Sequence, residues 1–279
     1  ITTFLNKDQV AAASKDFSKF VEAELNTKPL SYGPYYLDKV VNGESVLAKQ
    51  NPYYYKKDDV KVKEIQFKVV APAQASSVIK NGEIDYMSQV TPNVWSAVKD
   101  YSNGTLLGQP DFYISYVGFK LGTWDKEKNE VKVNPNAKAA DKRVRQAFGY
   151  AVDWDQLNEK IYKGLRFTPT NSGIYPTRSE DYYDKDGFKF KKDVEKAKKL
   201  LDEAGLKDTD GDGLREDNKG NKLVFNFAFQ GGNNYDQALA DTFIKSWKEV
   251  GLDVKLLDNK LMGKKEWDQR VLGDDPEID

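Results

Sequence analysis

The sequence predicts an α/β protein in which short strands alternate with amphipathic helices. The clearest evidence lies in residues 223–257, where a strand pattern, a helical pattern and a second strand pattern follow one another. Such a succession within so few residues is typical of a right-handed βαβ unit with parallel strands. An amphipathic helical pattern over 191–204 and an alternating apolar stretch over 62–70 show the same two periodicities earlier in the chain.

The first part of the chain predicts a β-hairpin followed by a strand. Asn42-Gly43 separates two short apolar runs, Tyr35–Val41 and Ser45–Lys49, and this arrangement is a strong hairpin signal. Residues 62–70 then alternate between apolar and polar side chains, which predicts a half-buried strand.

The next stretch predicts a short helix between extended segments. Residues 74–81 form a helical pattern that ends before Gly82, a favourable residue just after a helix C-terminus. We expect strands over 83–86, where Ile84 and Tyr86 alternate with acidic residues, and over 112–120.

The second half predicts three helices before the βαβ unit. Asp141 is placed to cap the first, and Asp153 with Gln156 forms a capping box at the start of the second. The third covers 191–204 and ends at Gly205. In the βαβ unit, the helix over 235–250 is expected to bury a stripe of large apolar residues: Leu239, Phe243, Trp247 and Val250.

Composition excludes several classes of function. The chain has 279 residues without cysteine or histidine, so Ser-His-Asp and Cys-His catalysis, zinc sites with nitrogen and sulfur ligands, and disulfides are absent. The 43 basic and 44 acidic side chains give a net charge of −1, which offers no electrostatic basis for binding nucleic acid. The abundant carboxylates leave a glycoside hydrolase open as an alternative, although nothing in the sequence marks one pair.

Residues 208–216 form a candidate calcium loop. Asp208, Asp210 and Asp212 occupy positions 1, 3 and 5 of the calcium-loop pattern, and Glu216 occupies position 9. Position 12 is Lys219, where an EF-hand has a bidentate glutamate. We expect this loop to be either a structural calcium site or a tight turn whose aspartates accept hydrogen bonds from their own backbone. No other cofactor is expected.

Six stretches resemble, in the same order, motifs of the extracytoplasmic solute-binding proteins of family 5, the oligopeptide- and dipeptide-binding group that feeds ABC importers. They are Ser31–Leu37 (SYGPYYL; GTGPYxL in the family), Asn51–Tyr55 (NPYYY; NPxYW), Ile65–Val69 (IQFKV; IxFKV), Ile79–Asp85 (IKNGEID; LKxGEID), Asp141–Asp153 (DKRVRQAFGYAVD; DxRVRQALxYAID) and Lys196–Gly213 (KAKxLLxEAG followed by DxDGDG).

The resemblance implies a periplasmic-binding-protein-like fold of type II, with two lobes and mixed sheets that contain βαβ units. It assigns residues 1–110 to part of the first lobe and residues 111–279 to an incomplete second lobe. Members of the family are longer, so the chain is expected to be a fragment that lacks part of the first lobe.

The resemblance also implies where a ligand binds. Ser88, Gln89 and Val90 follow the GEID motif, in a loop that is expected to contact the ligand backbone. Tyr113 and Tyr116 lie in a segment similar to the family's YYLGFN strand, which crosses between the lobes; plain strand packing is the alternative role for both. Lys120 stands where that motif has asparagine.

The resemblance finally implies a substrate-binding component of an ABC peptide importer without catalytic activity. The expected partners are a peptide ligand and a membrane-embedded ABC permease; the alternative within the family is another solute, such as a sugar, a metal chelate or a signalling peptide. We expect a monomer outside the cytoplasm, either a cell-surface lipoprotein or a periplasmic protein, with its signal and anchor upstream of Ile1. No apolar run approaches the roughly 20 residues that span a bilayer.

Overall fold

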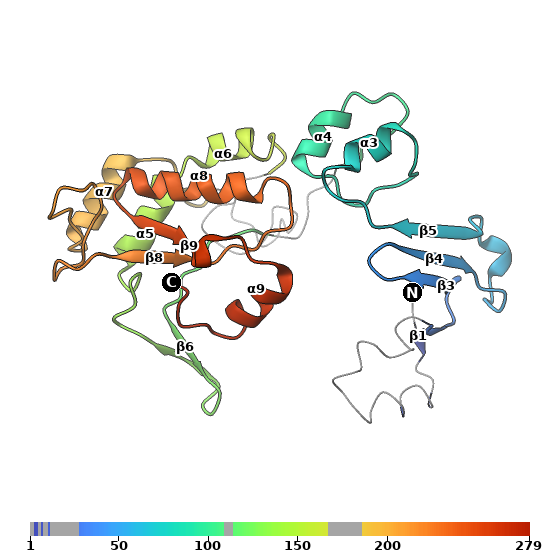
Figure 1. The fold of residues 1–279 in the computed structure, drawn as a ribbon, viewed down its shortest axis with the longest axis horizontal. Coiled ribbons are helices and arrows are strands. Elements are labelled where there is room, and N and C mark those ends of the chain that lie inside the picture. Colours follow the sequence, from blue (N-terminus) through green and yellow to red (C-terminus); the bar gives the residue numbers. More distant parts are fainter. Residues whose placement is uncertain (1–2, 5–6, 8–10, 12–27, 109–113, 167–185) are drawn as a thin grey trace. The chain divides into compact units, whose positions relative to one another are not determined.

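The computed structural model describes residues 3–4, 7, 11, 28–108, 114–166 and 186–279. The chain divides into two compact units, residues 1–74 and residues 75–279 (Figure 1). The predicted boundary between lobes at 110/111 lies outside the described residues and stays a prediction.

The described strands are β1 (Thr3–Phe4), β2 (Leu30–Ser31), β3 (Tyr35–Val41), β4 (Ser45–Gln50), β5 (Glu64–Lys68), β6 (Gly122–Asp125), β7 (Glu130–Val133), β8 (Val224–Phe227) and β9 (Asp253–Leu256). The helices are α3 (Ala75–Lys80), α4 (Pro92–Val98), α5 (Lys142–Ala151), α6 (Trp154–Lys160), α7 (Val194–Glu203), α8 (Asp236–Glu249) and α9 (Lys264–Val271), with 3₁₀ turns η2 (Lys57–Asp59) and η3 (Leu257–Asn259).

The first unit is built on an antiparallel sheet in the order β3-β4-β5. The predicted hairpin is confirmed, and Gly43 has a φ of 73°, the left-handed conformation that glycine adopts without steric cost. The strand predicted over 62–70 is confirmed as β5. It is less buried than expected, because Phe67 is exposed and only Ile65 is half-buried.

Asn51 joins two of the stretches that carry the family resemblance. Its side-chain Nδ2 donates to the main-chain oxygens of Ser31 and Gly33, both at 3.0 Å, and its Oδ1 accepts from Tyr53 N at 3.0 Å. Asn51 is buried, so these bonds satisfy a polar group that would otherwise lose its hydration. The asparagine therefore fixes the SYGPYYL turn against the NPYYY turn.

The second unit contains the predicted βαβ unit. Strands β8 and β9 are parallel, in the register Phe225↔Val254, and α8 connects them and packs against β9. Helix α5 packs against both α7 and α8 (Figure 1). The four residues predicted for the inner stripe of α8 are all buried.

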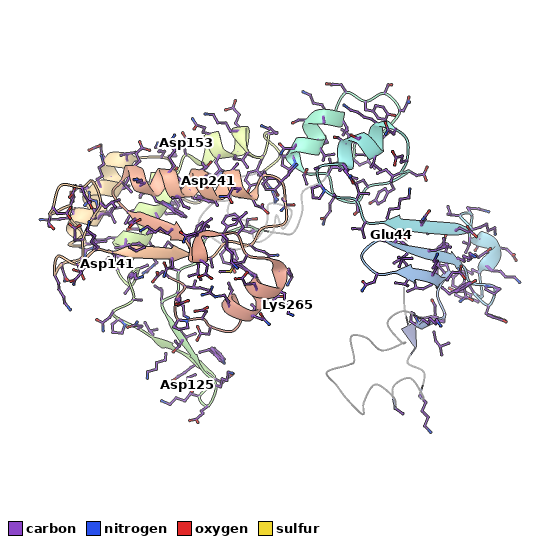
Figure 2. All side chains as sticks on the ribbon, viewed as in Figure 1. Glu44, Asp125, Asp141, Asp153, Asp241 and Lys265 are labelled. Carbon is purple, nitrogen blue, oxygen red and sulfur yellow. The ribbon has the colours of Figure 1, made fainter. Side chains whose placement is uncertain are left out.

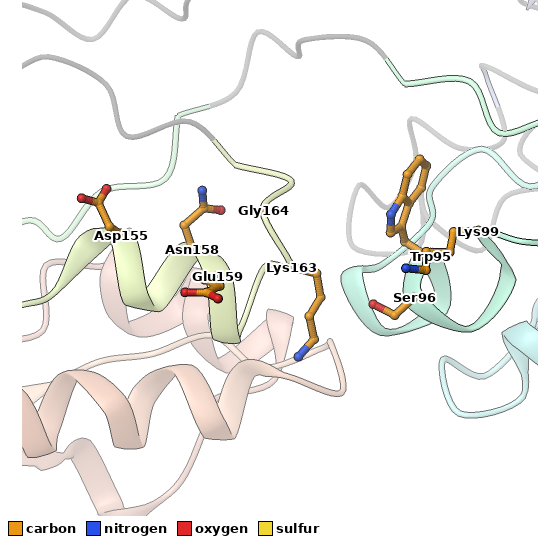
Figure 3. Close-up of a pocket in the computed structure, with 8 residues that line it drawn as sticks. All are labelled: Trp95, Ser96, Lys99, Asp155, Asn158, Glu159, Lys163 and Gly164. Atoms are coloured by element: carbon orange, nitrogen blue, oxygen red, sulfur yellow. The ribbon is translucent and has the colours of Figure 1, made fainter.

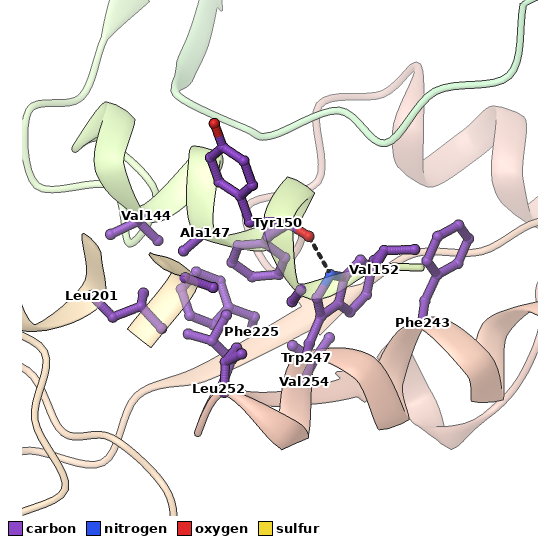
Figure 4. Packing of buried hydrophobic residues seen from close by; sticks show 14 of the residues in the cluster. Val144, Ala147, Tyr150, Val152, Leu201, Phe225, Phe243, Trp247, Leu252 and Val254 are labelled. Carbon is purple, nitrogen blue, oxygen red and sulfur yellow. Dashed lines mark hydrogen bonds between the residues drawn. The ribbon is translucent and has the colours of Figure 1, made fainter. Parts of the chain in front are cut away.

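The core of the second unit is aromatic (Figure 4). Phe148 lies at its centre and makes edge-to-face contacts with Phe119, Phe225 and Trp247, each with ring centroids 5.1 Å apart. Edge-to-face pairs of this kind add about 0.5–1.5 kcal/mol each beyond the area they bury. These contacts hold α5, α8 and β8 in one cluster.

The predicted helix starts are confirmed. Asp141 accepts a hydrogen bond from Arg143 N at 2.8 Å at the start of α5, and Asp153 accepts from Gln156 N at 2.9 Å at the start of α6 (Figure 2). The helix predicted over 191–204 is α7, with Asp193 as its cap and Gly205 just beyond its end.

Two predicted strands are wrong where the structure describes them. Residues 83–86 form no strand, because the chain after α3 closes the helix end with a bond from Glu83 N to Val78 O. Residues 114–120 also form no strand. Alternate side chains there, Val117 and Phe119, pack on the core, but no described strand lies beside them to complete a ladder.

The sequence did not lead us to expect several elements. The larger ones are α4, the hairpin β6–β7 and α9. Asp125 closes the hairpin turn by accepting from Glu127 N and Lys128 N (Figure 2). The hairpin projects from the core, and its strand β7 is exposed throughout, so its apolar pattern is weak.

Candidate functional site

The acidic loop over 208–216 lies between α7 and β8, and short antiparallel bridges close its base. Lys207 and Glu216 form an antiparallel bridge, and Glu216 forms another with Lys222. Arg215 ties the loop to the core, since its Nε donates to Val250 O at 2.9 Å and its Nη1 to Leu206 O at 2.6 Å. The base of the loop is therefore fixed by the βαβ unit.

The aspartates of the loop accept hydrogen bonds from its own backbone. Asp208 accepts from Gly211 N at 2.7 Å and from Gly213 N at 2.9 Å. Asp210 accepts from Asp212 N, and Asp212 accepts from Leu214 N. These bonds form the tight turn that is the alternative to a calcium site, and the three aspartates are exposed at the surface of the loop.

Glu216 is the buried carboxylate of the loop, with 2% of its surface exposed. Its Oε2 accepts from Thr209 N at 2.8 Å and from Thr209 Oγ1 at 2.7 Å, whereas no donor in the described part of the chain reaches Oε1. A buried polar atom without a partner costs about 1–3 kcal/mol, and more when the group is charged. The free oxygen of Glu216 therefore needs an explanation.

The structure brings three of the four predicted metal ligands together. One carboxylate oxygen from each of Asp208, Asp210 and Glu216 lies within 4.8 Å of the others. Asp212 is not in this group. Its Oδ2 lies 2.5 Å from Lys222 Nζ, whose hydrogen bond holds the pKa of the Asp212 carboxyl below its ordinary value.

The predicted ligand-contact residues lie on the surface of the second unit. Ser88 and Gln89 are exposed and Val90 is half-buried, immediately before α4. Tyr116 is 84% exposed, so the alternative of plain strand packing does not describe it. Tyr113 lies outside the described residues.

An open depression of about 480 Å³ lies elsewhere in this unit (Figure 3). Trp95 and Ser96 of α4 line one side of it, with Lys99 just beyond the end of that helix. Asp155, Asn158 and Glu159 of α6 line the other, together with Lys163 and Gly164 of the following turn. An aromatic ring and charges of both signs thus border the same space.

Hydrogen bonds hold the α6 side of the depression in place. Asn158 donates from Nδ2 to Arg166 O at 2.8 Å and accepts at Oδ1 from Arg166 N at 3.0 Å. Lys163 takes a left-handed φ of 55° in the turn that these bonds close.

Sequence reasoning missed the depression. None of the described residues predicted to bind ligand lines it, and α4, which contributes Trp95, was not predicted. The available signal was Thr91-Pro92, a cap residue followed by proline at the first helical position; Thr91 Oγ1 accepts from Val94 N.

Residues 3–275 match the family model described as bacterial extracellular solute-binding proteins, family 5 Middle. The chain belongs to this family. The family predicted from the six motifs is thus confirmed, and its description names solute binding as the function of its members.

Family-5 relatives include oligopeptide-binding proteins. The chain is 32% identical over 243 residues to the oligopeptide-binding protein OppA of Lactococcus lactis subsp. lactis strain IL1403, covering 86% of this chain and 40% of OppA. It therefore spans less than half the length of this relative.

Solved family-5 structures confirm the predicted periplasmic-binding-protein-like α/β fold. Lactococcal OppA complexed with an endogenous peptide in the closed conformation matches with a TM-score of 0.85 and 28% identity, over 97% of this chain and 49% of that one. NikZ from Campylobacter jejuni in complex with Ni(L-His) matches with a TM-score of 0.63 and 25% identity, over 87% of this chain and 44% of that one.

The structure also accounts for one departure from the family-5 motif. Lys120 stands in place of asparagine, and its Nζ lies 2.8 Å from Asp274 Oδ1 and donates to the main-chain oxygens of Asp274 and Asp275. The substituted side chain thus binds the C-terminal segment.

None of the helices within the described ranges has the length and apolarity needed to cross a membrane.

Proposed function

We propose that this chain is part of the substrate-binding component of an ABC peptide importer, which captures oligopeptides in a cleft and delivers them to a membrane permease. The observation that carries the proposal is the likeness to lactococcal OppA, a structure that holds an endogenous peptide, over 97% of this chain. No catalytic step belongs to this function, and family membership supports its absence.

The chemistry of the depression suits a peptide ligand. Peptides of different sequence share backbone amides and charged termini, and a receptor for many of them binds these common groups. Lys99 and Lys163 can attract a terminal carboxylate, Asp155 and Glu159 a terminal ammonium group, and Trp95 offers an apolar face. Water fills the remaining space and lets side chains of different size bind without a large loss of affinity.

We place the protein outside the cytoplasm as a monomer, either periplasmic or anchored to the cell surface by lipid. The family description supports the extracellular location. Within the same fold, NikZ holds Ni(L-His), so a metal chelate is the second candidate ligand.

Isothermal titration of the whole protein with a mixture of oligopeptides tests the proposal. We expect heat of binding and a change in tryptophan emission, with part of the emission change lost in Trp95→Phe. Ni(L-His) serves as the competing ligand. Binding of the chelate with no response to any peptide would exclude peptide capture.

The 279-residue chain by itself should bind peptides weakly or not at all. The depression is open, so water screens the charge contacts in it; once enclosed, each can contribute about 1.5–3 kcal/mol, and the relatives have further chain that can enclose a ligand. Submicromolar peptide binding by the isolated chain would contradict this expectation.

A further inference from the structure

We propose that Asp208, Asp210 and Glu216 hold one calcium ion, which braces the loop between α7 and β8. The proposal goes beyond peptide capture and rests on two independent observations. Three carboxylates converge in this loop, and one of them is buried with an oxygen that no described donor reaches.

The spacing of the oxygens suits a single ion. Calcium binds oxygen at about 2.3–2.6 Å, so oxygens on opposite sides of one ion are separated by roughly 5 Å. The three carboxylates each offer an oxygen within 4.8 Å of the other two, and one ion can therefore contact them all.

Glu216 provides what the sequence pattern lacks. An EF-hand takes its bidentate glutamate from position 12, where this chain has Lys219. Glu216 at position 9 is buried at the base of the loop, and Thr209 holds its Oε2 in a fixed orientation. Its Oε1 has no donor within the described residues, so this oxygen is available to an ion.

The chemistry of the ligands favours calcium. The cluster consists of carboxylates, which are hard oxygen ligands, and the chain contains no histidine or cysteine to attract zinc or copper. Magnesium demands near-octahedral geometry and gives up its water reluctantly, whereas calcium accepts an irregular loop of carboxylates.

The ammonium group of Lys222 competes with a calcium ion for the carboxylate of Asp210. The Lys222 Nζ lies 2.5 Å from Asp212 Oδ2 and 3.3 Å from Asp210 Oδ2, and the lysine side chain is 65% exposed. The ammonium group thus neutralises one edge of the cluster but forms no ion pair with Glu216. It can turn into solvent when calcium binds Asp210.

Titration of the chelator-treated chain with calcium chloride tests the proposal, with thermal melting in chelator and in millimolar calcium as a second readout. We expect one ion per chain and a higher melting temperature in calcium. Glu216→Gln should weaken calcium binding by about tenfold or more, and Lys222→Gln should strengthen it.

The sign of the Glu216→Gln effect separates a metal site from a plain turn. In chelator the variant should melt at the same temperature as the parent or higher, because a buried unpaired charge is removed; in calcium it should melt lower. Glu195→Gln removes one charge from an 88% exposed side chain on α7 and should leave the response to calcium unchanged.

Two results would overturn the proposal. One is the absence of heat and of any melting shift in both the parent chain and Lys222→Gln at millimolar calcium. The other is an equal shift with magnesium chloride at the same concentration. Neither result bears on peptide capture, because the titration with oligopeptides tests that proposal independently of calcium.

Discussion

The indole Nε1 of Trp247 donates a hydrogen bond of 3.1 Å to the main-chain oxygen of Phe148, 99 positions earlier in the chain. The bond joins α8 to α5 inside the core of the second unit, where Trp247 is 2% exposed (Figure 4). Trp247 also stacks on Phe243, with ring planes 11° apart. Its ring also lies 5.1 Å from that of Phe227, so the same side chain joins α8 to α5 and to β8.

Replacing Trp247 should be costly. Trp247→Phe keeps an aromatic ring but loses the hydrogen bond and leaves a cavity, so we expect a loss of about 1–3 kcal/mol in the free energy of unfolding; Trp247→Ala should lose about 3–5 kcal/mol. Urea denaturation measures both values. Trp124→Phe, at a half-exposed position on β6, is the matched control and should change stability by less than about 0.5 kcal/mol. Equal losses at the two positions would contradict the assigned role of Trp247.

The Asp141–Arg143 pair should make stability depend on pH. Hydrogen bonding from the Arg143 guanidinium holds the pKa of the Asp141 carboxyl below its ordinary 3.8. Because the folded-state pKa is depressed, the stabilisation is present above about pH 4 and is lost as the pH falls through the folded-state value. Because asparagine also caps a helix, Asp141→Asn should lose mainly this partly exposed ion pair, at a cost of about 0.5 kcal/mol at pH 7 and less at lower pH.

Arg143→Met is the companion variant for this pair. It removes the cause of the pKa shift and keeps the capping carboxylate, so its cost should decline in the same acidic range. Chemical denaturation at several pH values measures both variants. A cost that stays constant from neutral to acidic pH would show that the ion pair adds nothing to stability.

Gly149 in α5 should tolerate no side chain. Alanine normally stabilises a helix by about 1 kcal/mol relative to glycine. A Cβ at this position would lie 2.6 Å from the Phe190 ring, which packs against Tyr150 with centroids 5.1 Å apart. We expect the clash to outweigh the helix gain, so that Gly149→Ala destabilises by about 1–2 kcal/mol.

A double variant isolates the cause of this effect. In a Phe190→Ala background the clash disappears, and Gly149→Ala should become neutral or stabilising. Thermal melting of the four proteins forms the double-mutant cycle. The same destabilisation in both backgrounds would place the cause elsewhere.

Tyr116 offers a test of the predicted ligand contacts. Its side chain is exposed, so Tyr116→Ala should change the free energy of unfolding by less than about 0.5 kcal/mol. If the tyrosine contacts peptide, the affinity of the whole protein should fall by about tenfold, the effect of 1.4 kcal/mol. Tyr53→Ala, another exposed tyrosine, is the control and should retain affinity. An equal affinity in both variants would remove Tyr116 from the site.

Sequence patterns predicted the local elements well where a short-range signal decides the conformation. Asp141 and Asp153 mark helix starts because their carboxylates bind amides two or three residues ahead, and Gly43 marks a turn because it accepts a left-handed φ. The βαβ unit was also predictable, since its burial pattern repeats at the period of each element. Helix α4 carried a usable signal in Thr91-Pro92 that was overlooked.

Patterns failed where partners come from distant parts of the chain. Residues 114–120 have the alternation of a strand, but a strand also needs a hydrogen-bonded neighbour, which no described segment provides. The partner of Lys120 is Asp274, 154 positions away. Nothing near Lys120 in sequence could reveal that pairing.

The sequence by itself determined the class of the protein, the family to which it belongs and the order of most of its elements, because periodicity, capping residues and motifs act over a few neighbouring residues. Only the tertiary structure decided which groups are buried and what they meet. The acidic loop illustrates the difference: the spacing of Asp208, Asp210, Asp212 and Glu216 suggested four equivalent ligands. Folding instead buries Glu216 and turns Asp212 toward Lys222. Burial and long-range pairing follow from the packing of the whole chain, so no local pattern contains them.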